Sequence, residues 1–302
     1  MKIAVTGASG FIGRYVIPLL LGNGHEVCAI AHRSPADEIP DVRWIAADLL
    51  DERQCQAAVQ SARADCLLHL AWYAVHGKFW TAPENFAWVR ASSNLLEAFI
   101  AGGGKRAVIA GTCAEYDWSY GYCVEDLTPT RPATLYGRCK DATRQLSEAM
   151  CEASATEFAW GRIFFPYGVG EPGGRLLPSV LRSLSRNEPV LCSHGEQYRD
   201  FLHVEDVARA FVHLVESGQA TGAFNIASGQ PVRLADLVMK CVGLHRPGVQ
   251  PEFGAVAVAP DDPPLLVGSP RKLMDTGWAP RIALDDGIRR LIREHQTTME
   301  KK

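Results

Sequence analysis

The sequence lacks the features that indicate a membrane-spanning, secreted or nucleic-acid-binding protein. No apolar run approaches the roughly 18 residues of a membrane span. After Met-Lys only three apolar residues precede Thr6, and the apolar core of a signal peptide is longer. Lysine and arginine form no block, and the net charge is −3. A groove for nucleic acid needs clustered cations. We therefore expect a cytoplasmic protein that contacts neither a membrane nor nucleic acid.

Paired cysteines are also missing. The chain has nine cysteines, which is an odd number, and none of them forms a Cys-x-x-Cys pair. Small secreted disulfide frameworks are short and evenly paired. We therefore expect reduced, buried thiols and no metal centre.

The composition is that of an ordinary globular protein. Apolar residues make up 47% and charged residues 22% of the 302 residues, which excludes a disordered chain. The 27 glycines and 18 prolines follow no collagen-like period, and neither a repeat nor a low-complexity segment is present. This length predicts two domains or one large α/β unit.

Short apolar segments alternate with helical segments through the first half of the chain. This alternation predicts a Rossmann-type, doubly wound parallel sheet with helices on both faces. We expect strands at 2–6, 26–31, 42–46, 66–71, 107–111 and 157–165, and helices at 14–21, 91–101 and 137–153.

The pattern changes after Phe165, where a loop rich in glycine and proline is expected. The predicted nucleotide-binding domain covers 1–165 and also includes a later return segment, 200–228. A smaller C-terminal α/β lobe covers 166–199 and 229–302. Within these parts we expect a loop at 166–174, a helix at 176–185, a strand-turn-helix unit at 199–216, a strand at 223–227 and a final helix at 283–295.

Three glycines follow the first predicted strand and open the first predicted helix. Gly7, Gly10 and Gly13 have the spacing that lets a backbone approach a pyrophosphate at a helix N-terminus. This loop predicts a dinucleotide site, and its other predicted contacts are Ser9, Phe11 and Ile12.

The end of the second predicted strand bears on the choice of cofactor. NAD sites usually carry an acid there for the ribose hydroxyls, whereas this chain has Ala31, His32 and Arg33. An arginine binds a 2′-phosphate through paired hydrogen bonds, so NADP(H) is favoured over NAD(H), with a solvated Arg33 as the alternative.

An acidic residue, Asp48, follows the third predicted strand beside Leu49. We expect both residues at the adenine, with Asp48 accepting a hydrogen bond from the amino group. The alternative is that Asp48 caps the next helix.

Tyr136 and Lys140 stand four residues apart in a predicted helix and therefore share one face. An ammonium beside a phenol lowers the pKa of the phenol from about 10, which suits it to proton transfer. Thr112 ends the fifth predicted strand, at the mouth of the sheet, where its hydroxyl is placed to hold the same substrate oxygen.

Several motifs occur together and in a familiar order. With them the chain resembles the extended short-chain dehydrogenases/reductases, in particular the nucleotide-sugar epimerases, dehydratases and 4-ketoreductases. The motifs are Gly7-x-x-Gly10-x-x-Gly13, His69-Leu70-Ala71, Thr112-x-x-x-Tyr116, Tyr136-x-x-x-Lys140, Arg162–Gly168, Arg199–Ala208 and Gly277–Pro280.

The resemblance implies roles for these positions. Thr112, Tyr136 and Lys140 would be the catalytic triad, with Lys140 also holding the nicotinamide ribose. The C-terminal lobe would bind the substrate, a small-molecule nucleotide sugar. The remaining cofactor contacts would be Leu70, Ala71, Phe165 and Pro166, and the substrate contacts would be Cys113, Glu115, Tyr116, Arg175, Leu177 and Arg199.

Two of these residues have alternative interpretations, and the resemblance also implies a dimer. Arg199 would pair with the substrate diphosphate or, alternatively, with Asp200 or Asp206. Cys113 is alternatively an inert packing thiol, because no activating histidine is evident.

A homodimer would form through the helices at 91–101 and 137–153.

The chain departs from the family pattern at a few positions. The stretch Val258-Ala-Pro-Asp261 lacks the arginine that epimerases often carry there, and Trp88 stands where asparagine is common. Cys113 occupies the place of the acid in dehydratases. We therefore expect an NADPH-dependent reductase of a nucleoside-diphosphate 4-keto-6-deoxyhexose. The alternatives are a 4-epimerase or dehydratase with tightly bound NAD, and a non-catalytic NAD(P)-binding sensor.

Overall fold

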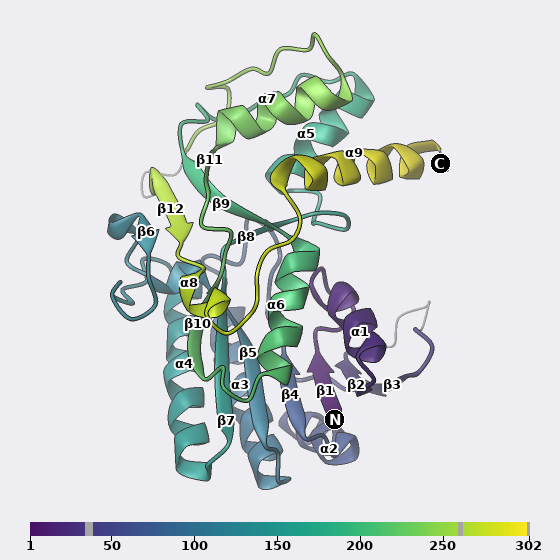
Figure 1. The fold of residues 1–302 in the computed structure, drawn as a ribbon, viewed down its shortest axis with the longest axis vertical. Helices are drawn as coiled ribbons and strands as arrows, with labels where there is room; N and C mark the ends of the chain where they lie inside the picture. Colours follow the sequence, from purple (N-terminus) through teal and green to yellow (C-terminus); the bar gives the residue numbers. More distant parts are fainter. Residues whose placement is uncertain (34–38, 259–261, 301–302) are drawn as a thin grey trace.

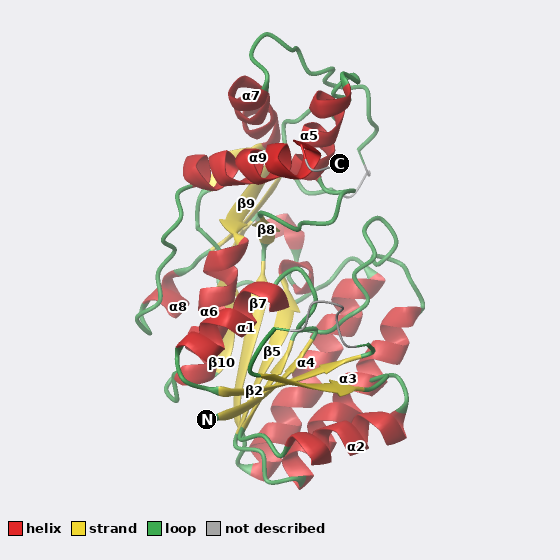
Figure 2. Ribbon diagram, turned by 90° about the vertical axis from the view of Figure 1, so that its right-hand side faces the viewer, coloured by secondary structure: helices red, strands yellow, loops and turns green. Residues whose placement is uncertain are grey.

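Two sheets form the framework of the protein, which is described here from a computed structural model covering residues 1–33, 39–258 and 262–300. The larger sheet is entirely parallel (Figures 1 and 2). Its strands, in spatial order, are β10 (Gly222–Ile226), β7 (Glu157–Ile163), β5 (Arg106–Thr112), β4 (Cys66–His69), β1 (Lys2–Thr6), β2 (Glu26–Ala31) and β3 (Val42–Ala46).

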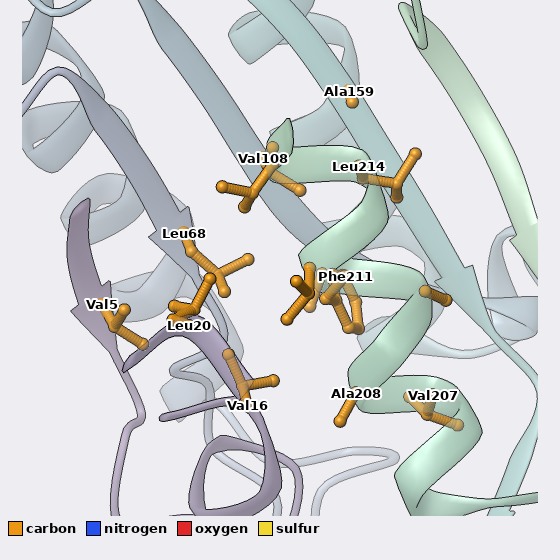
Figure 3. Close-up of a cluster of buried hydrophobic side chains, with 14 of the residues drawn as sticks. Val5, Val16, Leu20, Leu68, Val108, Ala159, Val207, Ala208, Phe211 and Leu214 are labelled. Carbon is orange, nitrogen blue, oxygen red and sulfur yellow. The ribbon is translucent and has the colours of Figure 1, made fainter. Parts of the chain in front are cut away.

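Helices cover both faces of this sheet. One face carries α1 (Gly13–Gly22) and α6 (Val204–Glu216), and the other carries α2 (Glu52–Ala62), α3 (Glu84–Ala101) and α4 (Leu135–Ser154). Successive residues of a strand point to opposite faces, so the sheet feeds two cores. Figure 3 shows the first core, where side chains of α1 and α6 meet Val5, Leu68 and Val108. The predicted doubly wound α/β fold is confirmed.

A smaller lobe is built on the second sheet. Its strand order is β11 (Pro231–Arg233), β9 (Tyr198–His203), β12 (Leu265–Gly268) and β6 (Tyr122–Cys123), with β8 (Phe165–Tyr167) paired to β9. The helices of the lobe, α5 (Leu176–Arg186), α7 (Leu234–His245) and α9 (Leu284–Glu300), enclose a core of their own. This lobe lies above the larger sheet in Figure 1. Three short helical turns complete the chain: η1 (Cys113–Glu115), η2 (Trp118–Tyr120) and α8 (Arg271–Met274).

The two parts exchange more segments than the sequence predicted. The predicted return segment 200–228 is divided, because β9 pairs within the smaller sheet while β10 joins the larger one. In the opposite direction, β6 leaves the first part of the chain to pair with β12, and Leu273 and Trp278 pack into the core under α1 and α6. Fully buried Asp206 reinforces this exchange, since it accepts hydrogen bonds from the amides of Arg281 and Ile282 at 2.8 and 2.9 Å.

Three boundaries also differ from those predicted. The strand expected at 157–165 ends at Ile163, and the expected loop at 166–174 begins inside β8, which pairs in parallel with β9. The helix expected at 91–101 begins at Glu84, after Pro83. The strand β8 forms because it pairs with β9, which is distant in the sequence.

Within the described ranges, no helix is long and apolar enough to cross a membrane. The same residues contain no group of three side chains arranged to hold a metal ion. All nine cysteines are free and buried, as predicted.

Candidate active site

The glycine loop lies at the point where the order of the larger sheet reverses. The loop follows β1, and its neighbour on the other side is the turn at Leu70 and Ala71, which follows β4. Gly7 has φ +71°, and a Cβ there would come 2.8 Å from the amide nitrogen of Ala71. A Cβ at Gly13 would come 2.2 Å from the carbonyl oxygen of Gly7. Glycine is required because the backbones are already in contact.

The helix that follows this loop has a free N-terminus. Ile12 is the N-cap of α1, and its side chain makes no capping hydrogen bond. The first amides of a helix then point outward together with the positive end of its dipole. We call the loop of Gly7, Gly10 and Gly13 the glycine cradle. Unpaired amides at a helix N-terminus beside such a loop are suited to bind the pyrophosphate of a dinucleotide. Ser9 and Gly10 are exposed there, while Phe11 and Ile12 are half-buried.

A buried histidine joins β1 to β4 beneath the loop. The Nδ1 atom of His69 lies 2.6 Å from the Thr6 hydroxyl, and its Nε2 atom lies 2.9 Å from the Ser92 hydroxyl. Burial lowers the pKa of His69 to about 3, and the nearby Lys140 acts in the same direction. The ring is therefore neutral and holds Leu70 and Ala71 against Gly7.

The ends of β2 and β3 lie on the predicted adenosine side. His32 and Arg33 are exposed immediately after β2. The carboxylate of Asp48 accepts a hydrogen bond from the Leu50 amide at 2.9 Å, whereas Asp51 is the N-cap of α2. Asp48 is therefore not the helix cap that we considered as an alternative.

Thr112 sits at the end of β5 and begins the turn η1. Its hydroxyl accepts a hydrogen bond from the Ala114 amide at 3.2 Å, and Glu115 accepts one from the Thr112 amide at 2.8 Å. This reciprocal arrangement is a capping box. It fixes the Thr112 hydroxyl at the carboxyl edge of the sheet.

Tyr136 is brought to Thr112 by the start of α4. Thr134 caps this helix by accepting a hydrogen bond from the Gly137 amide at 3.0 Å. A Cβ at Gly137 would come 2.2 Å from the carbonyl oxygen of Ala114, so only glycine lets α4 approach η1 this closely. Burial raises the pKa of Tyr136, while a hydrogen bond with the Thr112 side chain opposes that shift.

Lys140 lies one turn further along α4 but does not act on the phenol as predicted. Its Nζ atom donates a hydrogen bond to the Ala110 carbonyl at 2.7 Å and lies 4.0 Å from the centroid of the Trp72 ring. Burial lowers the pKa of Lys140 to about 7. The predicted lowering of the tyrosine pKa is therefore corrected, since desolvation outweighs the other influences on Tyr136.

Aromatic side chains surround Tyr136, and the sequence analysis did not assign them to the site. The ring centroids of Trp72, Phe79 and Trp80 lie 6.5, 4.9 and 5.8 Å from that of Tyr136. Trp118 lies 6.0 Å from Trp80. We call Trp72, Phe79, Trp80 and Trp118 the aromatic wall. The density of aromatic residues between positions 72 and 88 was the signal available in the sequence.

Comparison with known proteins agrees with this geometry. The sequence profile of the NAD dependent epimerase/dehydratase family matches residues 3–227. The chain belongs to this family. The predicted assignment to the extended short-chain dehydrogenases/reductases is confirmed, and the protein is an NAD(P)-dependent enzyme of that type.

Similar proteins within the family carry several activities. The chain is 29% identical to a dTDP-6-deoxy-L-talose 4-dehydrogenase (NAD(+)) of Aggregatibacter actinomycetemcomitans over 84% of this chain and 94% of the relative. It is 25% identical to a UDP-glucose 4-epimerase of Halalkalibacterium halodurans over 93% of this chain and 91% of the relative. The UDP-glucose 4-epimerase of Thermus thermophilus, solved in complex with NAD, has the same fold, with a TM-score of 0.87, 24% identity and coverage of 98% of this chain and 99% of that one.

Glu115 and Tyr116 lie behind the site rather than at its surface. Both side chains are fully buried. Glu115 accepts hydrogen bonds from Trp160 at 3.0 Å and from Arg162 at 2.7 Å. The Tyr116 hydroxyl donates to Asn225 at 2.8 Å and accepts from Arg162 at 3.0 Å. The expected sugar contacts of these two residues are therefore corrected, because protein groups already occupy their polar atoms.

Cys113 and Leu177 also face inward. Cys113 is 6% exposed, and burial raises the pKa of its thiol, which fits the alternative of an inert packing residue. Leu177 is 1% exposed and packs in the core of the smaller lobe. The expected substrate contacts of both residues are corrected accordingly.

Arg199 has a partner that the sequence analysis did not consider. Its Nη2 atom lies 2.7 Å from a carboxylate oxygen of Asp262. Asp200 instead accepts hydrogen bonds from the amides of Ser228 and Gly229 at 2.7 and 2.9 Å. Asp206 pairs with Arg209, so both acids considered as partners of Arg199 are engaged elsewhere.

Arg175 lies near Tyr136. It is half-buried at the start of α5, donates a hydrogen bond to the carbonyl of Pro166 at 3.3 Å, and acts to lower the pKa of Tyr136. Phe165, half-buried, and Pro166, buried, form the start of β8 beside it. The stretch Val258–Asp261, where the family arginine is missing, lies outside the described residues from 259 onward.

Proposed function

We propose that the protein is an NADPH-dependent reductase of a nucleoside-diphosphate 4-keto-6-deoxyhexose. The observation that carries this proposal is the close approach of α4 to η1 at Gly137 and Ala114, which brings Tyr136 next to Thr112 at the carboxyl edge of the sheet. The relative from Aggregatibacter supports the type of chemistry, because 4-dehydrogenation of a 6-deoxy sugar is the reverse of 4-keto reduction. The dehydratase acid is absent, since Cys113 stands beside Thr112.

The triad residues have separate tasks in this reaction. The bound cofactor supplies hydride to the keto carbon. Tyr136 gives its proton to the oxygen of that carbonyl, and its raised pKa keeps it protonated beforehand. The Thr112 hydroxyl donates a second hydrogen bond to the same oxygen as negative charge develops. Lys140, one helical turn away, would hold the nicotinamide ribose.

We infer a preference for NADP(H) from the end of β2. Ala31 carries no acid to repel a 2′-phosphate, and the next two side chains, His32 and Arg33, are exposed. A guanidinium is well suited to bind a phosphate through paired hydrogen bonds.

Two arginines are proposed to bind the substrate diphosphate. Arg175 is half-buried near Tyr136. Arg199 meets the diphosphate in competition with Asp262, its present partner. We also propose a homodimer through α3 and α4, where Phe86 and Leu146 are 53% and 48% exposed.

A 4-epimerase with tightly bound NAD is the second candidate, favoured by the similarity to the epimerase of Halalkalibacterium. The same triad would then remove and return the proton, and the reaction would produce no net oxidation. Retention of NAD through purification, together with interconversion of two nucleotide sugars, would identify it. A non-catalytic sensor is disfavoured because Thr112, Tyr136 and Lys140 are all present.

The decisive test mixes the purified protein with NADPH or NADH and a panel of nucleoside-diphosphate 4-keto-6-deoxyhexoses. We expect oxidation of NADPH, followed by absorbance, with at least one substrate. Tyr136→Phe should lower kcat by roughly 10²–10⁴-fold while the protein stays folded. If no keto sugar oxidises NADPH, or if Tyr136→Phe retains full activity, the proposal is wrong.

A further inference from the structure

The aromatic wall has features that proton transfer by Tyr136 does not require. The rings of Phe79 and Trp80 stand nearly edge-on to Tyr136, at interplanar angles of 78° and 87°. Trp118 continues the wall beyond Trp80 at an angle of 89°. Three large rings therefore contact the ring of Tyr136, and Trp118 extends the wall through Trp80.

The wall is held in place by its own polar groups. The indole N–H of Trp72 donates to Asn85 at 2.8 Å, and that of Trp118 donates to the Cys113 carbonyl at 3.2 Å. The Trp80 carbonyl accepts a hydrogen bond from the Tyr136 amide at 3.1 Å, which ties the wall to α4. With its indole N–H engaged, Trp118 presents mainly ring carbons to a ligand, whereas the Trp72 ring already has the Lys140 Nζ atom 4.0 Å from its centroid.

Part of the wall remains accessible. Trp80 is 37% exposed although it contacts both Phe79 and Tyr136. Trp72, Phe79 and Trp118 are each half-buried. An aromatic surface that is rigid and partly open beside a catalytic group is suited to bind an apolar face of a ligand.

We propose that the aromatic wall makes the site selective for a hexose that lacks the C6 hydroxyl. The inference rests on the proposed function, since it places the sugar next to Tyr136. A C6 methyl group and the C–H face of the ring gain by contact with ring carbons. A C6 hydroxyl in the same place would lose its hydrogen bonds to water and would find few hydrogen-bonding partners in the wall. Trp80 is the residue through which we test this selectivity.

The test measures binding, so it does not depend on turnover. The probes are glucose and 6-deoxyglucose linked to dTDP, UDP or CDP, together with the free nucleoside diphosphates, titrated by calorimetry. We expect the wild type to bind at least one 6-deoxy compound about 10-fold more tightly than its 6-hydroxy counterpart. An apolar site discriminates by about this factor between ligands that differ in one small group. Trp80→Ala should reduce this ratio to under about 3-fold. Its affinity for the nucleoside diphosphate alone should not change.

Two further variants separate stacking from a general structural effect. Trp80→Phe keeps an aromatic ring and should restore most of the ratio. Phe253→Ala removes an aromatic residue with a matching exposed fraction, 38%, outside the wall, and should leave the ratio unchanged. Equal binding of both sugars by the wild type, a ratio that survives Trp80→Ala, or no binding of any pair would each overturn the inference. Failure of the proposed function is a different result, in which the binding ratio holds but no keto sugar oxidises NADPH.

Discussion

The two sides of the candidate active site differ in kind, because backbone atoms form the cofactor side and aromatic side chains form the substrate side. On the cofactor side, backbone meets backbone at Gly7 and Gly13, where an added Cβ would come 2.8 and 2.2 Å from neighbouring main-chain atoms. On the substrate side, rings of the aromatic wall meet Tyr136 at centroid distances of 4.9 to 6.5 Å. A backbone cradle excludes any added atom, whereas a wall of rings tolerates the exchange of one ring for another. Substitutions should therefore abolish function on the first side and change selectivity on the second.

The largest effect should come from Gly13→Ala, which tests the cofactor side. The new methyl group would collide with the carbonyl oxygens of Gly7 and Ala8, at 2.2 and 2.6 Å, so the backbone of the loop would have to shift. We expect NADPH binding, measured by calorimetry, to be lost. Gly22→Ala, at the other end of α1, is the control, because a Cβ there meets nothing within 4 Å. Unchanged binding by Gly13→Ala would show that the cradle is not rigid.

The second prediction concerns the support behind the substrate side. Glu115→Gln removes the charge that faces Arg162 in a fully buried pair, so the free energy of unfolding should fall by about 3 kcal/mol. Denaturant unfolding measures the change. Glu148→Gln removes an acid from a partly exposed pair with Arg144 on α4 and should cost less than about 1 kcal/mol. Equal losses in the two variants would contradict a structural role specific to Glu115.

The third prediction is a pH dependence on the cofactor side. The pKa of His69 is lowered from 6.5 to about 3 by burial, so the folded protein resists its protonation. Its contribution to stability is complete above pH 6.5 and is lost as the pH falls toward 3, by up to about 1.4 kcal/mol per pH unit. Unfolding of the wild type and of His69→Gln should be compared across this range. The variant should show a shallower loss, and parallel curves would exclude His69 as the cause.

The smallest effect is expected from Arg33→Ser, which changes cofactor choice without touching the cradle. Loss of one charged hydrogen-bonding partner should lower the NADPH-to-NADH affinity ratio by about 10-fold. Arg289→Ser, an exposed arginine of α9, is the control. A ratio that stays constant would mean that Arg33 is only a solvated side chain.

The sequence predicted correctly the features that depend on residues close together in the chain. The glycine loop, the alternation of strands and helices, and the spacing of Tyr136 and Lys140 each depend on neighbours along the chain. Prediction failed for Glu115, Tyr116 and Leu177, which share short segments with site residues but point inward. Whether a side chain of such a segment faces the cleft or the core depends on what packs against it, and that partner is distant in sequence.

The sequence alone determined the fold class, the family, and the positions of the glycine loop and of Thr112, Tyr136 and Lys140 on their strand and helix, because backbone sterics and helical or strand periodicity act over a few residues. Only the tertiary structure decided that Arg199 pairs with Asp262, 63 residues away, and that Lys140 turns to Ala110 and Trp72. The same is true of the aromatic wall, in which rings from the segment before α3 contact Tyr136 of α4 and one of them also contacts Trp118 of η2. Such contacts join segments whose approach depends on how the whole chain packs.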